Sequence, residues 1–323
     1  MKAWKLTEAK KLQLATIDET EGQNGLVKVK IARAALSSSD ISSFLSNEKE
    51  KFIPSRTALG LISEAFGETY KKGERVLLSP YQNKVADGED LSVKSVDCDG
   101  YLCDFTYVDQ EYIYALPDGI ADEAVEFVED IALASKVYSK LNIESSQYVL
   151  IYGCSATSLI LAQLCIYYQA IPIVVDSSQE RLAIASELGI YYNLDSSKED
   201  ISLAIKEITS GNFADFLIVD TDAFPYVNDT LSYVGKNGKV GLIGFNKNIS
   251  QLKGDFAPVI NLGLTVYGVN DGFGEIASAI NFLATQTVHV EKLIANVVAF
   301  DDVPNAILEL SGKQNCFKTI VKC

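Results

Sequence analysis

Residues 148–158 read YVLIYGCSATS, and they determine the fold class more than any other stretch of the chain. The apolar first half predicts a buried strand, Gly153 a tight turn, and a helix is expected over 159–168. A second apolar run over 171–175 ends at Asp176. The order of strand, glycine turn, helix, strand and acid is the context of a dinucleotide-binding unit.

The same alternation continues beyond this unit. A helix is expected over 180–189, and further apolar strands over 216–220 and 240–244. Strands without polar alternation, separated by helical stretches, imply a parallel sheet that is covered on both faces. We therefore expect an α/β fold in which residues 119–270 form a doubly wound Rossmann domain.

The segments on either side of this domain have a different sequence pattern. Residues 1–118 are irregular and strand-rich, and the polar stretch 83–99 predicts a surface loop. After residue 270 we expect a helix, an extended piece over 293–300 and a closing strand over 317–321. These segments predict a second, β-rich domain made of 1–118 and completed by 271–323.

The composition limits the classes of partner that the protein is expected to bind. The chain has 323 residues, 48% of them hydrophobic, which is enough for two packed domains. It carries 28 Lys and Arg against 43 Asp and Glu, and the net charge of -15 repels phosphate backbones and anionic lipid headgroups. We therefore expect neither a nucleic-acid nor a membrane partner, although solubility alone would also explain the charge.

The cysteines and apolar segments point to an ordinary intracellular protein. None of the six cysteines forms a CxxC pair, and the first residues, MKAWKL, lack the apolar core of a signal peptide. Residues 159–175 form the longest apolar stretch, but Gln163, Gln169 and Pro172 interrupt it, so it predicts a helix and a strand rather than a membrane span. Free thiols and a cytoplasmic location are expected.

The cofactor fingerprint is altered. The GxGxxG turn is represented by Gly153, Ser155 and Ser158, so only the glycine of the tight turn is kept. Asp176 strengthens the interpretation, because a carboxylate at the end of the second strand binds ribose hydroxyls and favours NAD(H) over NADP(H). The alternative is that Asp176 merely caps the helix that begins after Ser177.

Three further stretches carry a family resemblance. Residues 73–76 read GERV, residues 99–105 read DGYLCDF, and residues 176–182 read DSSQERL. In this order and spacing they resemble the medium-chain dehydrogenases/reductases, which include zinc alcohol and sorbitol dehydrogenases and zinc-free quinone reductases. The resemblance implies a GroES-like catalytic domain over 1–118 and 271–323. It also implies a homodimer or homotetramer paired through edge strands such as 240–244 and 264–268.

Against the family pattern, the zinc ligands have been replaced. The resemblance aligns Ser37 with a thiolate ligand and Ser55-Arg56-Thr57 with the family's G-H-E motif, while Glu129 keeps the acid of its E-P-L stretch. In the stretch 83–98, where the family has a four-cysteine lobe, only Cys98 is present, and a structural zinc needs four ligands. We therefore expect no zinc at either position.

The replaced site has its own candidate groups. We hypothesise that Arg56, with Asp40 and Glu129 nearby, takes over the electropositive role of the metal. The alternative is an ion pair that only fills the vacated site. The resemblance also aligns Ser39 with a proton-relaying hydroxyl, or else it is a turn serine, and aligns Lys318 with a cofactor-phosphate contact, or else it is a solvated lysine.

Two functions remain open. The first is a zinc-independent NAD(H)-dependent oxidoreductase that transfers hydride to or from a small carbonyl, alcohol or enone substrate. The second is a catalytically inactive, dehydrogenase-like binding or scaffold subunit, because two fingerprint glycines and most ligand positions have changed. Binding of NADH with turnover would distinguish the first function from the second.

Overall fold

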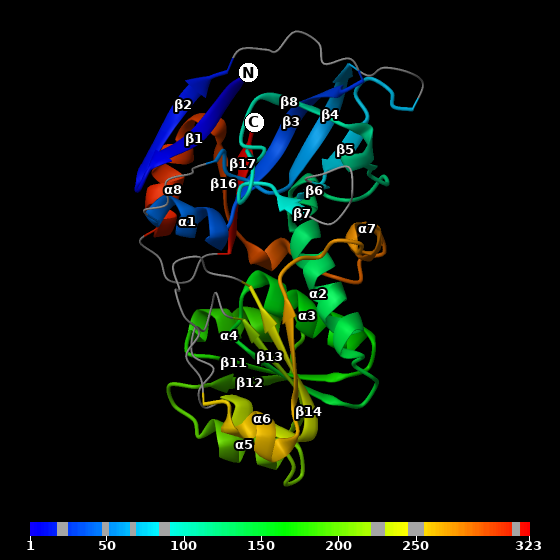
Figure 1. Cartoon of the computed structure of the whole chain (residues 1–323), viewed down its shortest axis with the longest axis vertical. Helices are drawn as coiled ribbons and strands as arrows, with labels where there is room; N and C mark the ends of the chain where they lie inside the picture. Colours follow the sequence, from blue (N-terminus) through cyan, green and yellow to red (C-terminus); the bar gives the residue numbers. More distant parts are fainter. Residues whose placement is uncertain are drawn as a thin grey trace. The chain divides into compact units, whose positions relative to one another are not determined.

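The chain folds into two compact units. The first comprises Met1–Glu129 with Leu293–Cys323, and the second comprises Asp130–Lys292 (Figure 1). The structure, a computed structural model, describes residues 1–17, 25–46, 52–64, 69–83, 91–220, 230–244, 255–311 and 317–323. Each unit has its own sheet and its own hydrophobic core.

The second unit is built on a six-stranded parallel sheet. Its strands lie in the order β12-β11-β10-β13-β14-β15, and each neighbouring pair is parallel. This is the doubly wound Rossmann order, and it confirms the predicted α/β fold class. The strands are β10 (Tyr148–Tyr152), β11 (Ile171–Asp176), β12 (Tyr192–Asp195), β13 (Ala214–Asp220), β14 (Val234–Ile243) and β15 (Thr265–Val269).

Helices cover both faces of this sheet, as the unbroken apolar strands predicted. On one face, Leu150 and Leu217 share a core with Ile205 of α5. On the other face, a Cβ atom on Gly241 of β14 would lie 3.3 Å from Leu141 of α2, so the glycine gives that helix room to pack. The helices are α2 (Val128–Leu141), α3 (Ala156–Tyr167), α4 (Gln179–Glu187), α5 (Ile201–Ile208), α6 (Ala257–Leu262) and α7 (Ile276–Ala284).

Short polar side chains begin three of these helices. Ser155, Ser178 and Asp200 are the N-cap residues of α3, α4 and α5, and each side chain accepts a hydrogen bond from the backbone N–H three residues later. Gly153 directly follows β10 and has φ 101°, a value that is strained in other residues, and its N–H donates to the Val175 carbonyl at 2.8 Å. The turn itself therefore requires this glycine.

The first unit is β-rich. Its seven-stranded sheet follows the path β16-β17-β3-β4-β5-β9, with β8 paired to β3, and two further strand pairs are β1-β2 and β6-β7. The C-terminal β17 is antiparallel to β3, so the end of the chain completes a sheet begun near its start. The strands are β1 (Lys2–Glu8), β2 (Lys11–Thr16), β3 (Val27–Leu36), β4 (Ala58–Glu64), β5 (Arg75–Leu78), β6 (Tyr81–Asn83), β7 (Leu91–Val93), β8 (Phe105–Val108), β9 (Ile113–Ala115), β16 (Ile294–Ala299) and β17 (Lys318–Lys322).

Two helices close the core of this unit. They are α1 (Ser38–Leu45) and α8 (Val303–Ser311). Phe44 of α1 and Ile307 of α8 are buried with Val29 and Ile31 of β3 in one cluster. A short 3-10 helix, Asp122–Phe127, leads directly into α2.

Two expectations from the sequence are wrong. The stretch 83–99 is not simply a surface loop, because β7 pairs with β6, and Ser92 and Ser95 are buried. The expected edge strand 240–244 lies instead inside the sheet, since β14 has β13 on one side and β15 on the other. Its apolar character comes from burial between helices and not from a partner subunit.

The compact units divide the chain after Glu129 and after Lys292, whereas the predicted domains divided it after residues 118 and 270. Among the residues after 270, Gly272 packs closely on α2, since a Cβ atom on it would lie 2.6 Å from the backbone of Ala132. The assignment of these ranges to a catalytic domain and a cofactor domain stays a prediction.

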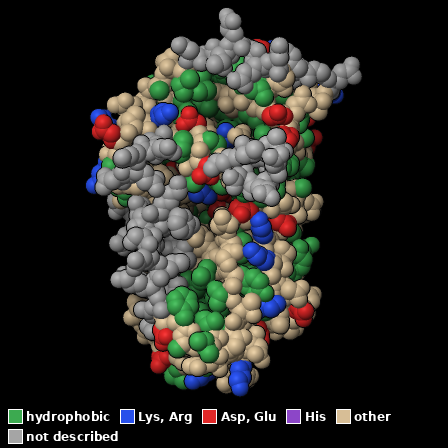
Figure 2. Space-filling view, viewed as in Figure 1, with side chains coloured by type: hydrophobic (Ala, Val, Ile, Leu, Met, Phe, Trp, Pro, Cys, Tyr) green, Lys and Arg blue, Asp and Glu red, His purple; other side chains and the backbone are tan. Residues whose placement is uncertain are grey.

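The described surface fits the charge balance of the sequence. Figure 2 shows acidic and basic side chains scattered among apolar ones on one face, without a continuous basic patch among the residues that are coloured. Within the described ranges, no helix is long and apolar enough to cross a membrane.

Candidate active site

The Asp40 carboxylate organises the polar residues around α1. Asp40 is buried in the first turn of α1, and its Oδ2 accepts hydrogen bonds from the backbone N–H (2.9 Å) and the hydroxyl (2.7 Å) of Ser37. Its Oδ1 accepts from the backbone N–H of Ser55 (3.1 Å) and the hydroxyl of Ser95 (2.7 Å). The carboxylate therefore ties α1 to two loops of the first unit.

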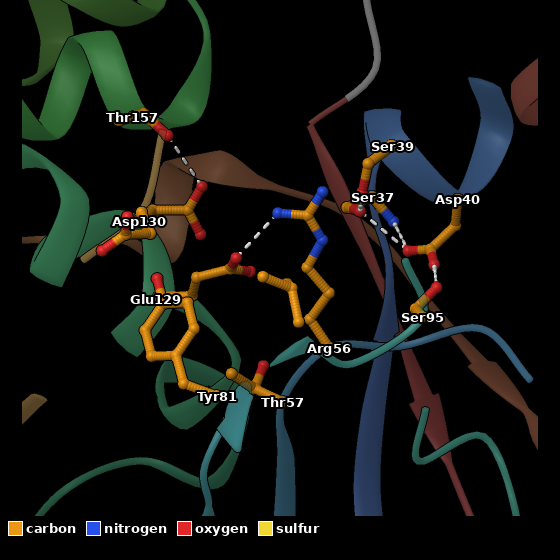
Figure 3. Close-up of polar contacts among 12 residues, drawn as sticks. Ser37, Ser39, Asp40, Arg56, Thr57, Tyr81, Ser95, Glu129, Asp130 and Thr157 are labelled. Atoms are coloured by element: carbon orange, nitrogen blue, oxygen red, sulfur yellow. Dashed lines mark hydrogen bonds and ion pairs between the residues drawn. The ribbon is translucent and has the colours of Figure 1, made fainter. Parts of the chain in front are cut away.

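Ser39 joins this group through Ser37. The two hydroxyl oxygens are 2.8 Å apart, and Ser37 directs its hydroxyl proton to Asp40. Ser39 is consequently the donor toward Ser37, and its own oxygen keeps lone pairs for another donor. Figure 3 shows the resulting chain from Ser39 through Ser37 to Asp40. The structure thus brings two of the predicted site residues together.

The loop that precedes Arg56 is held by its backbone. The N–H of Gly100 donates to the Ile53 carbonyl at 2.8 Å, and a Cβ atom on Gly100 would lie 2.2 Å from the Ser55 carbonyl oxygen. Ser55 has φ 74°, a left-handed value that is uncommon outside glycine. Its hydroxyl donates to the Thr57 carbonyl at 2.8 Å, which stabilises this conformation and fixes the direction in which Arg56 leaves the loop.

Arg56 forms an ion pair with Glu129. Its Nη1 donates to Oε1 of Glu129 at 2.7 Å, and the two side chains are 25% and 14% exposed (Figure 3). Burial alone would lower the pKa of the guanidinium, but Glu129, with smaller contributions from Asp40 and Tyr81, raises this pKa above its usual value. Arg56 therefore stays charged and acts as a fixed donor rather than an acid or base.

A second acid, Glu126, was missed by the sequence reasoning. It is fully buried, its Oε1 accepts from the Leu59 N–H at 2.9 Å, and its Oε2 accepts from the Thr57 hydroxyl at 3.1 Å. Burial raises the pKa of this carboxyl to about 8, although Lys318 and the two hydrogen bonds oppose the shift. The signal in the sequence was a charged residue within the apolar run 124–128.

Lys318 lies beside Glu126 in the first unit. It is only 7% exposed, and its Nζ donates to the Glu126 carbonyl at 2.7 Å and lies 5.3 Å from the centre of the Phe127 ring. The alternative interpretation of Lys318 as a solvated lysine is therefore wrong, because β17 places this residue inside the unit. Its predicted contact with a cofactor phosphate stays a prediction.

The Gly153 turn lies in the second unit. The Ser155 oxygen accepts from the Ser158 N–H at 3.1 Å, and the Ser155 hydroxyl donates to the Ser158 hydroxyl oxygen at 3.3 Å. The buried Ser158 hydroxyl donates in turn to Oδ2 of Asp220 at 3.2 Å. Both serines that replace fingerprint glycines thus make local hydrogen bonds at the start of α3.

Asp176 ends β11 beside the same turn. Its Oδ2 accepts from the Cys154 N–H at 2.8 Å and lies 3.6 Å from Nη1 of Arg181. Its Oδ1 accepts from the Ser178 N–H at 2.8 Å, so the carboxylate also supports the start of α4. The N-cap of α4 is Ser178 and not Asp176, which only holds the N–H of that cap residue. This contact is compatible with a role as ribose ligand, because a carboxylate has about four acceptor sites.

The His, Cys, Asp and Glu side chains of the described residues form no metal-binding cluster. Within the described ranges, no group of three or more His, Cys, Asp or Glu side chains is arranged to hold a metal ion. Burial raises the pKa of the Cys103, Cys154 and Cys165 thiols, which is typical of structural cysteines. Cys316 lies outside the described residues.

Known proteins are similar to this chain in sequence and fold. A family model described as zinc-binding dehydrogenase matches residues 156–285. An uncharacterized zinc-type alcohol dehydrogenase-like protein of Haemophilus influenzae is 28% identical over 249 residues, which are 74% of this chain and 72% of the relative. The D-arabitol-phosphate dehydrogenase of Enterococcus avium is 26% identical over 262 residues, 73% of each chain.

The chain is thus similar in sequence to zinc-type alcohol dehydrogenase-like proteins. Solved structures agree on the fold. An Escherichia coli alcohol dehydrogenase complexed with NADH superposes with a TM-score of 0.88 at 22% identity, over 100% of this chain and 99% of that one. The 2R,3R-butanediol dehydrogenase of Bacillus subtilis gives 0.86 at 20% identity, with the same coverage.

The predicted site residues fall into two groups. Ser39, Asp40, Arg56, Glu129 and Lys318 lie in the first unit, and Gly153, Ser155, Ser158 and Asp176 lie in the second. Inside each group the residues are linked by the hydrogen bonds described above.

Proposed function

We propose that the protein is a zinc-independent, NAD(H)-preferring oxidoreductase that acts on a small carbonyl, alcohol or enone substrate. The observation that carries the proposal is the Arg56–Glu129 pair at 2.7 Å, which holds a permanently charged donor where the family has a metal ligand. The nicotinamide supplies or receives the hydride.

Arg56 is suited to stabilise a substrate oxygen. Among the described residues, Glu129 is the hydrogen-bond partner of its guanidinium through Nη1, and Nε is buried without a partner. The donors of Nη2 remain for a ligand. A donor that is already oriented by Glu129 needs little reorganisation when negative charge develops on a carbonyl oxygen.

The Ser39 chain supplies a path for the proton. Because Ser39 donates to Ser37, its oxygen is oriented to accept from a substrate hydroxyl, and the proton of that hydroxyl would pass toward Asp40. In the opposite direction, the same hydroxyls would return a proton to a carbonyl oxygen. This role does not require a metal at the site.

The donor set does not suit zinc. The positions that align with its ligands hold the Ser37 hydroxyl, the Arg56 guanidinium and the Glu129 carboxylate that Arg56 already binds. A cation cannot bind a metal, and a neutral hydroxyl is a poor substitute for thiolate or imidazole. We therefore assign no step to zinc.

The Gly153 turn suits a dinucleotide. Ser155 caps the N–H of Ser158, which leaves the first-turn amides of Ala156 and Thr157 without intrahelical acceptors and available to a pyrophosphate. Asp176 would accept from the adenosine ribose. Because Arg181 lies 3.6 Å from Asp176 and offsets its charge, we expect only a moderate preference for NADH over NADPH.

A second candidate is a dehydrogenase-like subunit without turnover. The contacts of Arg56, Asp40 and Ser158 favour it, because each of these side chains already binds a neighbouring side chain of the protein. Groups that satisfy one another would also stabilise a site that has lost its chemistry.

The deciding experiment is a titration of purified, metal-analysed protein with NADH and NADPH, monitored by cofactor fluorescence, followed by a screen of aldehydes, ketones, alcohols and enones. We expect tighter binding of NADH and turnover without zinc. NADH binding without turnover favours the subunit. If neither nucleotide binds, the oxidoreductase proposal is wrong.

We also propose a homodimer or homotetramer formed through β15. This strand is the sheet edge next to β14, and Val266 on it is 38% exposed. On the neighbouring α6, Ile260 is 84% exposed, and Figure 2 shows apolar side chains over this region. Val266→Lys should convert the oligomer to a monomer in analytical ultracentrifugation, whereas an exposed control, Leu203→Lys, should not.

A further inference from the structure

Glu126 is a buried acid with no role in the function proposed above, and it lies one helical turn before Glu129. It belongs to the 3-10 helix Asp122–Phe127, and Glu129 belongs to the first turn of α2, which follows without a break. Residues three apart on such a helix lie on the same side. Both carboxylates thus face β4 and the loop before it.

The two acids hold consecutive parts of one segment. Glu129 binds the side chain of Arg56 at 2.7 Å, while Glu126 binds the Thr57 hydroxyl at 3.1 Å and the Leu59 N–H at 2.9 Å. Thr57 is 2% exposed and Glu126 is 0% exposed, so water does not compete for these contacts. A buried carboxyl group that accepts hydrogen bonds from two neighbours is a rigid anchor.

We propose that Glu126 is the positioning residue for Arg56. It fixes the start of β4 relative to the helix that carries Glu129, and it thereby holds the guanidinium in register with its partner. Lys318 also holds this segment, since its Nζ donates to the backbone carbonyl of Glu126 at 2.7 Å. The proposal rests on the proposed role of Arg56 and adds a residue that touches neither substrate nor cofactor.

Glu126 is titratable, so it gives a pH signature that a glutamine at this position would lack. Lys318 of β17 and Arg33 of β3 face it with positive charge, and Cys323 at the end of β17 is the other titratable neighbour. Burial raises the pKa of Glu126 to about 8, above its unfolded value of 4.5. The folded state therefore holds the proton more tightly, and this stabilisation is present below pH 4.5 and lost as pH rises toward 8.

The experiment measures the exposure of Arg56 without substrate or cofactor. The full-length protein is treated with phenylglyoxal, and the rate of arginine modification is read by peptide mapping, with Arg75 as internal reference. Arg75 is a good reference because it also pairs with a carboxylate, Asp122, at 2.8 Å. The variants are Glu126→Met, which removes the anchor, Glu126→Gln, which keeps an acceptor for the Leu59 N–H, and the milder Thr57→Val.

We expect Glu126→Met to raise the Arg56 rate about tenfold relative to Arg75, Thr57→Val about threefold, and Glu126→Gln less than about twofold. Between pH 5 and 8.5, the urea midpoint of the wild type should fall relative to that of Glu126→Gln. An unchanged Arg56 rate in both Glu126→Met and Thr57→Val, or an equal rise at Arg75, would overturn the proposal. Failure to turn over any substrate would contradict the proposed function. It would not affect the present test, because the modification rates are measured without substrate or cofactor.

Discussion

The Arg56 site and the Gly153 turn have departed from the family pattern in different ways. In the first, the replacements change charge, and the new Arg56 binds the retained acid Glu129 at 2.7 Å. In the second, serines replace glycines without a change of charge, and the Gly153 conformation remains. Under the proposed function, the Arg56 site is the substrate side and the Gly153 turn the cofactor side, and the comparison then teaches that the substrate side was rebuilt while the cofactor side was only modified. Variants on the substrate side should therefore have the larger effects.

The largest effect is expected for Arg56→Ala. Removal of an oriented charged donor should lower kcat/KM about 100-fold or more for whichever substrate the screen identifies. The measurement is steady-state kinetics at saturating NADH. Arg75→Ala is the matched control, because Arg75 is 29% exposed and also pairs with an acid. Equal losses in the two variants would mean that Arg56 contributes only to the fold.

Asp40→Asn tests the other half of the substrate side. The carboxylate accepts from four donors, and an amide group would face two of them with its own N–H groups. We expect a loss of about 2–4 kcal/mol in the free energy of unfolding, measured with urea. Asp97→Asn in the neighbouring turn should lose less than about 1 kcal/mol, since Asp97 is exposed. A loss of less than about 1 kcal/mol in the free energy of unfolding of Asp40→Asn would contradict the role of Asp40 as an anchor.

The comparison also shows what the sequence could predict. The Rossmann strands and the Gly153 turn follow from local patterns, namely apolar runs and a glycine at a position with positive φ. The contacts of Asp40 and Glu126 do not, because Ser95 is 55 residues from Asp40 and Leu59 is 67 residues from Glu126. Such pairs depend on which strands become neighbours. The family resemblance identified Arg56, but only the fold could identify what holds it.

On the cofactor side, Asp176→Asn should weaken NADH binding about tenfold, because a charge-assisted bond to the ribose becomes a neutral one. The measurement is the Kd from cofactor fluorescence. Asp195→Asn is the matched control, since Asp195 pairs in register with Asp176 at the end of the adjacent strand and is similarly buried. Unchanged affinity in Asp176→Asn would leave Asp176 only with its structural contacts to the N–H groups of Cys154 and Ser178.

The smallest effect is expected for Ser158→Gly, which restores a fingerprint glycine. The Ser158 hydroxyl joins Ser155 to Asp220, so its removal should lower stability by about 1 kcal/mol. If the turn has been modified without loss of function, the Kd for NADH changes less than about threefold. If the serines have disabled the turn, the glycine should instead tighten binding more than about tenfold. This variant therefore separates an adapted cofactor side from an eroded one, and a Ser158→Ala control shows whether the hydroxyl or the Cβ atom is responsible.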